Sequence, residues 1–345
     1  MVDDDPQPRG VHLVGSLPLA SSSDVFRTAG EILGERLLRL PDGETGVRSD
    51  WIRWQMDVLT ATPGLEMAPP STNAYVQRPQ VQLSSESRPS EVTFGPLGYA
   101  RAARDSYAQF EHMKEDGVIA RSCRFQVSLP TPLAVVNSFV ARRDRAALEP
   151  AYERRLLAEL DEITEAIPHT HLAAQWDVAI EIGILEGVIP SHLTDPRREI
   201  IDRLVRLGNR VPGEVELGYH LCYGDAGHRH FKQPEDTGLL VDVANALSAA
   251  VTRPIQWIHL PVPRERSDEA FFAPLRSLRL HPETRLYLGL VHYTDGVAGT
   301  QRRIAAARRT CSDFGVATEC GMGRRPPETI PDLLRIHAEV SAHAA

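Results

Sequence analysis

The stretch Glu-Val-Glu-Leu-Gly-Tyr-His-Leu-Cys at 214–222 has the pattern of a buried β-strand that ends in two side chains able to bind a metal. His220 and Cys222 are two residues apart, so on a strand their side chains point to the same face. A helical pattern follows at residues 236–251. A strand followed by a helix is the repeating unit of a parallel sheet, and the stretch therefore predicts an α/β fold.

The same unit recurs along the chain. The eight strand candidates are residues 11–17, 36–40, 124–129, 172–180, 214–222, 255–262, 285–292 and 315–320. Helical periodicity is clearest at 149–166, 197–207, 236–251, 299–314 and 327–342. Eight strands, each followed by a helix or a long loop, predict a single (β/α)8 TIM barrel with enlarged loops at its C-terminal face.

Two segments fall outside this repeat. Residues 1–10 are acidic and proline-rich and are expected to form a disordered N-terminal tail, which leaves residues 11–345 for the barrel. Residues 45–100 are rich in Pro, Ser and Gln and lack periodicity. We expect an extended loop there, with one helix at 48–59.

Composition narrows the class of protein. The chain has 345 residues, a net charge of −8 and no basic patch, which argues against nucleic acid as a partner. It has no apolar run near the ~18 residues of a membrane span, and its start lacks the features of a signal peptide. Four cysteines in a chain of this length do not form a disulfide framework. We expect a cytoplasmic protein with a small-molecule substrate and no membrane partner, either monomeric or homo-oligomeric.

Polar side chains gather at the carboxyl ends of the predicted strands. In TIM barrels this end carries the active site, so the shared location favours an enzyme. The residues are Ser16, Asp42, Glu44, Ser128, Asp177, Glu181, His220, Cys222, His259, His292, Glu319 and Cys320.

Three of these side chains predict a zinc site. His220, Cys222 and Cys320 provide one imidazole and two thiols, a ligand set that suits Zn²⁺ with an open fourth position. His259 is expected either as a fourth ligand or as a hydrogen-bond partner of a ligand. The alternative is a metal-free site in which the histidine and the cysteines are ordinary buried packing. Cys123 and Cys311 are expected to be inert packing.

At these motifs the sequence resembles the superfamily of cobalamin-independent methionine synthase and uroporphyrinogen decarboxylase. The resemblance is closest to the catalytic C-terminal barrel of the synthase and spans nearly the whole chain. His-Leu-Cys at 220–222 and Glu-Cys-Gly at 319–321 look like the family's zinc motifs. Val-Gly-Ser-Leu-Pro at 14–18, Asp-Gly-Glu at 42–44 and Gln-Trp-Asp at 175–177 look like its substrate segments.

The resemblance implies roles for individual residues. Ser16, Glu44 and Asp177 would bind the substrate, with the two carboxylates at its amino group, and His292 would be the catalytic acid. His259 stands where the family has a glutamate ligand. Val136-Asn137-Ser138-Phe139 lacks the tryptophan on which the family's folate packs.

These observations together predict a zinc-dependent transferase that methylates or alkylates a thiol, with a small amino thiol or thioether as its substrate. Two alternatives remain open: a zinc-dependent lyase or hydrolase on the same barrel, and a metal-free decarboxylase-like or binding protein.

Overall fold

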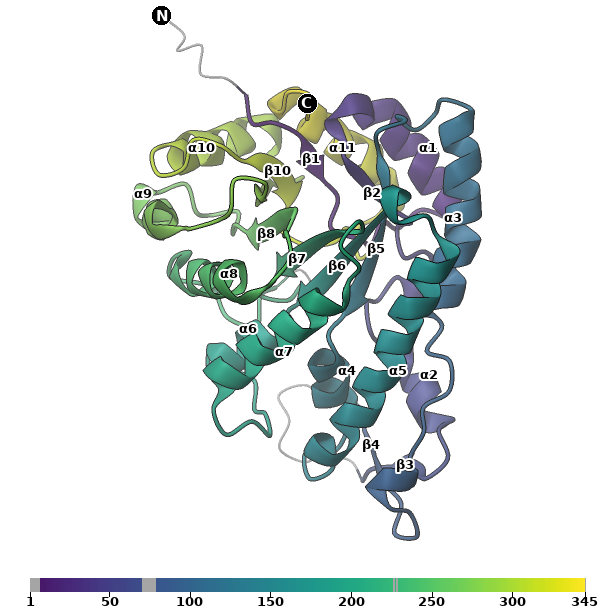
Figure 1. Ribbon diagram of the computed structural model, residues 1–345. Helices are drawn as coiled ribbons and strands as arrows, with labels where there is room; N and C mark the ends of the chain where they lie inside the picture. The colour runs from purple at the N-terminus through teal and green to yellow at the C-terminus, as the bar shows by residue number, and fades with distance from the viewer. Residues whose placement is uncertain (1–6, 70–78, 226, 228, 345) are drawn as a thin grey trace, which may run out of the picture.

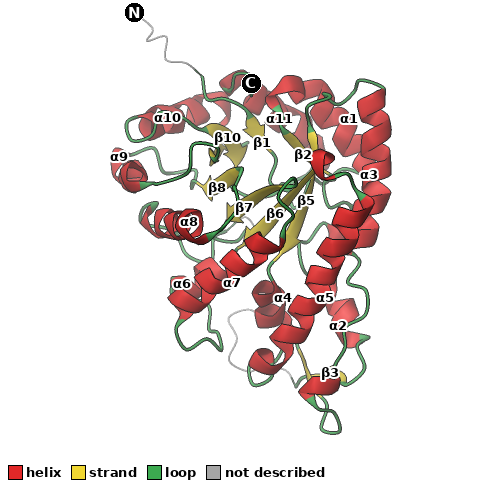
Figure 2. Cartoon of the chain, in the orientation of Figure 1, coloured by secondary structure: helices red, strands yellow, loops and turns green. Residues whose placement is uncertain are grey.

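The computed structural model describes residues 7–69, 79–225, 227 and 229–344, and its centre is an eight-stranded parallel barrel (Figures 1 and 2). The strands follow the order β1-β10-β9-β8-β7-β6-β5-β2, and every neighbouring pair is parallel. Parallel bridges from Val11 to Leu37 and from Ser16 to Gly43 join the β1 and β2 segments and close the ring. The strands are β1 (Val11–His12), β2 (Arg39–Pro41), β5 (Arg124–Pro130), β6 (Leu172–Val178), β7 (Glu216–Leu221), β8 (Trp257–Pro261), β9 (Arg285–Val291) and β10 (Gly315–Thr318). The predicted barrel and all eight strand positions are confirmed.

Helices surround the barrel on its outer side (Figure 1). They are α1 (Ser22–Leu33), α2 (Gln55–Thr60), α3 (Tyr99–Glu115), α4 (Pro132–Phe139), α5 (Arg145–Ala166), α6 (Ile180–Leu185), α7 (Pro196–Arg210), α8 (Gly238–Ala250), α9 (Glu269–Phe272), α10 (Gly296–Arg308) and α11 (Ile330–Val340). Local sequence explains where several begin. The Asp195 side chain accepts from the Arg198 N–H at the start of α7, and Thr131 caps α4 in the same way.

All five predicted helices are present, with ends shifted by a few residues. Helices α1, α3, α4, α6 and α9 were missed, although Ser21 at the start of α1 is a capping residue that could have indicated that helix. No helix among the described residues has both the length and the apolar character needed to cross a bilayer.

The excursion between β2 and α3 holds more regular structure than expected. It contains a 3₁₀ turn at Gly46–Arg48, helix α2 and an antiparallel hairpin of β3 (Leu65–Met67) with β4 (Val81–Leu83). The predicted helix at 48–59 therefore begins later, at Gln55. The hairpin strands have three residues each, too few for a period-2 pattern to be visible in the sequence.

The expected tail is ordered at its inner end. Arg9 forms a parallel bridge with Ala342, and the Gln7 side chain donates to the Glu339 carbonyl. The boundary predicted at residue 10 is therefore corrected, because these contacts tie residues 7–10 to the end of the chain. Residues 1–6 lie outside the described part.

Candidate metal centre

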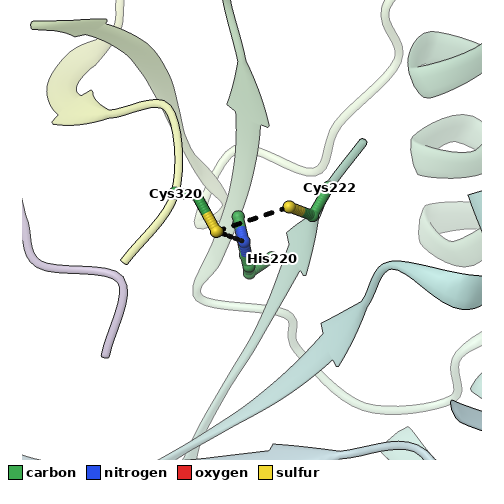
Figure 3. Close-up of side chains that lie close together, drawn as sticks. All are labelled: His220, Cys222 and Cys320. Atoms are coloured by element: carbon green, nitrogen blue, oxygen red, sulfur yellow. Dashed lines mark hydrogen bonds between the residues drawn. The ribbon is translucent and has the colours of Figure 1, made fainter. Parts of the chain in front are cut away.

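Three side chains that the sequence predicted as metal ligands converge at the carboxyl end of the barrel (Figure 3). His220 is on β7, Cys222 follows that strand, and Cys320 follows β10. The Cys222 and Cys320 sulfur atoms are 3.5 Å apart, and the Cys320 sulfur lies 3.7 Å from His220 Nε2. All three ligand atoms lie within 4.8 Å of one another, close enough to share one ion.

The chemistry of this donor set fits a cation. Contact with Cys222 and burial raise the pKa of the Cys320 thiol well above its usual value. Two thiolates this close in a buried site repel each other, and a bound cation removes that cost. One imidazole and two sulfurs are the ligands that Zn²⁺ prefers.

A chain of hydrogen bonds orients His220 for this role. His259 Nε2 lies 3.0 Å from the Thr318 carbonyl, which can only accept, so this nitrogen carries a proton. The other nitrogen of neutral His259, Nδ1, then accepts from His220 Nδ1 at 2.7 Å. Burial lowers the pKa of both rings, which keeps them neutral. His220 Nε2 is consequently the unprotonated nitrogen, and it faces Cys320.

The expectation that His259 is a fourth ligand does not fit this geometry. Both of its ring nitrogens are occupied by protein partners, and it lies on the far side of the His220 ring from the sulfurs. Its position is that of a hydrogen-bond partner that holds a metal-binding histidine in one tautomer.

Ser16 anchors the loop that carries Cys320. The Ser16 carbonyl accepts from Met322 N at 2.7 Å, and its hydroxyl accepts from Gly323 N at 3.2 Å. A Cβ at Gly321 would lie 2.4 Å from the Ser16 hydroxyl, so a larger residue there would push the Ser16 side chain out of its contact with the loop. Ser16, predicted as a substrate residue, therefore packs directly against the metal loop.

Two carboxylates lie on the neighbouring side of the mouth. Asp177 on β6 is the register partner of His220 on β7. Burial and the charge of Asp177 raise the pKa of Glu44 to about 8, and burial raises the pKa of Asp177 to about 7. Near neutral pH the pair retains a proton, which a bound cation such as an ammonium group would displace.

The Asp-Gly-Glu motif presents Glu44 through a structural turn. The Asp42 carboxylate accepts from the Glu44 N–H at 2.9 Å, from Arg48 at 2.6 Å and from Ser106 at 2.8 Å. Glu44 itself has a φ of +48°, a conformation that is uncommon for residues other than glycine. Asp42 thus builds the turn, and Glu44 lines a pocket with Arg48 and Ser128.

His292 belongs to a second group beside the metal cluster. Its Nε2 donates to the Val262 carbonyl at 2.9 Å, and its Nδ1 lies 3.8 Å from Glu319. The other Glu319 oxygen is 2.7 Å from His230 Nε2. Burial lowers the pKa of His292, whereas the contact with Glu319 raises that of His230 against the effect of burial.

Sequence reasoning missed the part that His230 and Glu319 play in this group. His230 follows β7 in a glycine-containing loop, where solvated histidines are common, and Glu319 was predicted only as one of the polar side chains at the carboxyl ends of the strands. The neighbouring His228 lies outside the described residues.

Comparisons with known proteins agree with the fold. The sequence matches no protein-family model, and the search of curated proteins found no match. Two of the similar solved structures match over nearly their whole length. One is a Listeria monocytogenes protein provisionally assigned as a vitamin B12-independent methionine synthase, with 16% identity, a TM-score of 0.56 and 98% of both chains covered. The other is a B12-independent methionine synthase from Shewanella sp. W3-18-1 in complex with selenomethionine, with 14% identity, a TM-score of 0.61 and 96% of both chains covered. In its fold, therefore, this chain is similar to structures described as B12-independent methionine synthases.

Proposed function

We propose that this protein is a zinc-dependent transferase that moves a methyl or other alkyl group onto the sulfur of an amino thiol such as homocysteine. The observation that carries the proposal is the juxtaposition of two sites. The His220–Cys222–Cys320 cluster lies at the barrel mouth, and Asp177, a buried carboxylate, is the register partner of His220.

In this proposal His220, Cys222 and Cys320 would hold the metal, which would also bind the substrate sulfur. A free thiol has a pKa near 8.5, and coordination to Zn²⁺ deprotonates it while keeping it nucleophilic. The hydrogen bond from His220 Nδ1 to His259 keeps His220 Nε2 unprotonated, so that this nitrogen could bind the metal.

Glu44 and Asp177 would bind the ammonium group of the substrate. Together with the metal they define two attachment points, one for sulfur and one for nitrogen, and so select an amino thiol. The sulfur forms a bond to the alkyl carbon as the bond from that carbon to its leaving group breaks. His292 Nε2 keeps its proton on the Val262 carbonyl, so Nδ1 would take up the proton released by the substrate thiol and pass it to the leaving group.

The first test is metal dependence. We expect about one zinc per chain, and we expect Cys320→Ser and Cys222→Ser to lose both the zinc and the alkylation of homocysteine while the circular dichroism spectrum stays unchanged. Cys311→Ser is the matched control, because Cys311 lies outside the cluster. Full zinc occupancy in both cluster variants, measured by elemental analysis, would contradict the proposal.

The reaction type is tested separately. Consumption of the thiol with formation of a thioether distinguishes a transferase from a lyase or hydrolase, which would release a thiol from a thioether. Release of thiol without any alkylation would support that alternative instead.

A further inference from the structure

A buried amide lies directly beneath the Asp177 carboxylate inside the barrel. Gln175 is two residues before Asp177 on β6, so both side chains point to the same face, and Gln175 is 0% exposed. Its Nε2 donates to Asp177 Oδ1 at 2.9 Å and to the Val14 carbonyl at 2.6 Å. Its Oε1 accepts from Trp257 Nε1 at 3.2 Å and contacts His12 Nε2 at 2.9 Å.

The chemistry of these partners allows only one orientation of the amide. The indole N–H of Trp257 can only donate, so the oxygen of Gln175 must face it. The Val14 carbonyl can only accept, so the NH₂ group must lie at the other end. A flipped amide would therefore place its NH₂ group against the Trp257 N–H and its oxygen against the Val14 carbonyl. Asp177 always meets the donor end.

Trp257 is itself held in place. Gly218 on β7 is its register partner, and a Cβ at that position would lie 1.9 Å from the indole ring. Arg39 lies on β2, across the barrel from Trp257, and its guanidinium is 4.1 Å from the centre of the indole ring. The indole is thus confined, and its N–H stays directed at Gln175.

We propose that Gln175, oriented by Trp257, is a positioning residue that makes the site selective for thiols carrying an amino group. This inference rests on the proposed function. Gln175 holds one oxygen of Asp177 in place before the substrate arrives, so that the carboxylate meets an ammonium group without rearranging. A substrate without an amino group gains nothing from this arrangement.

The test compares binding of two thiols to the zinc-loaded protein by isothermal titration calorimetry. The probes are L-homocysteine and 4-mercaptobutyrate, which differ only in the amino group. We expect the wild-type protein to prefer homocysteine, and we expect Gln175→Met to reduce that preference about tenfold. Affinity for 4-mercaptobutyrate and zinc content should stay unchanged. Trp257→Phe should shift the preference in the same direction by less, because Val14 still orients the amide.

Gln55→Met is the matched control. Gln55 is also 0% exposed, donating to the Leu97 carbonyl and accepting from the Tyr152 hydroxyl, but its hydrogen bonds do not reach Asp177. This variant should retain the wild-type preference. If Gln175 acts through Asp177, Gln175→Met should have no further effect on the preference in an Asp177→Asn background.

The outcomes separate this inference from the proposed function. If neither probe binds to the zinc-loaded wild-type protein, the proposed function fails and this inference falls with it. If the wild-type protein prefers homocysteine and Gln175→Met keeps that preference, only this inference is overturned. Two further results would overturn it. One is an equal loss of affinity for both probes in Gln175→Met, and the other is an additive loss of preference when Gln175→Met is combined with Asp177→Asn.

Discussion

At the scale of single residues, the role of each carboxylate depends on its surroundings. Asp42 has three hydrogen-bond donors and builds a turn, whereas Glu44, two residues later, is under the influence of the buried Asp177 carboxylate. Burial and Asp177 raise the pKa of Glu44 to about 8. A carboxylate held in this way is typical of a binding site for a cation rather than of a solvated turn.

The Glu44 side chain provides the first prediction at this scale. A charge-assisted contact with an ammonium group contributes about 1.5–3 kcal/mol, so Glu44→Gln should raise the KM for an amino thiol at least ~10-fold. The KM for the analogue without the amino group should barely change. Steady-state kinetics with both substrates measures this, and equal small effects would indicate that Glu44 is only part of a turn.

Glu181 predicts a pH-dependent stability. Burial raises its pKa to about 7, although a hydrogen bond from Thr131 opposes the shift. Between about pH 4.5 and pH 7 the folded protein therefore binds one proton more than the unfolded chain. The free energy of unfolding that this group contributes falls as the pH rises through that window, by roughly 3 kcal/mol in all. Glu181→Gln should reduce the loss of stability between pH 5 and pH 8 in urea unfolding, while Glu44 and Asp177 keep their own contributions to it. An unchanged loss would contradict the prediction.

At the scale of elements, Cys320 differs from the other two members of the cluster because a loop, not a strand, holds it. Cys320 follows β10, and its loop is held by Ser16 from the loop after β1. These two elements are neighbours in the sheet, which explains how a residue near the start of the chain supports a ligand near its end.

Gly321 tests this dependence. A methyl group there would collide with Ser16 and displace Cys320, so Gly321→Ala should weaken zinc binding by about 10–100-fold, as expected when a support of a metal ligand is lost. Competition with a chromogenic chelator measures the affinity. Gly213→Ala is the control, because a Cβ at Gly213 meets no atom within 4 Å. Equal zinc affinities in Gly321→Ala and Gly213→Ala would show that Ser16 does not control the position of the Cys320 loop.

At the scale of the whole molecule, one barrel contains every residue assigned to the proposed reaction. The segment at 136–139, where the resembling family has its folate-stacking tryptophan, lies on α4, and Val136 and Phe139 are buried there. This segment therefore offers no large exposed ring for a pterin.

We accordingly expect weak or no turnover with methyl-tetrahydrofolate as the donor. Homocysteine consumption, measured with the zinc-loaded protein, checks this. A smaller methyl donor such as a methylated sulfonium is the comparison, because it needs no stacking surface. Robust turnover with the folate would show that another part of the mouth binds the pterin.

The sequence by itself determined the barrel and the His220–Cys222–Cys320 cluster, because both depend on local patterns. Strand and helix periodicity identified all eight barrel strands, and the placement of His220, Cys222 and Cys320 at strand ends brought them to one mouth. Parallel strands share their direction, so residues at their carboxyl ends must meet.

Only the tertiary structure decided what surrounds that cluster. The partners of His259, the anchoring of the Cys320 loop by Ser16 and the orientation of Gln175 by Trp257 all depend on which atoms meet across the barrel. Those contacts join residues far apart in the chain. Their hydrogen bonds are specific in distance and direction, and spacing along one strand carries no information about either.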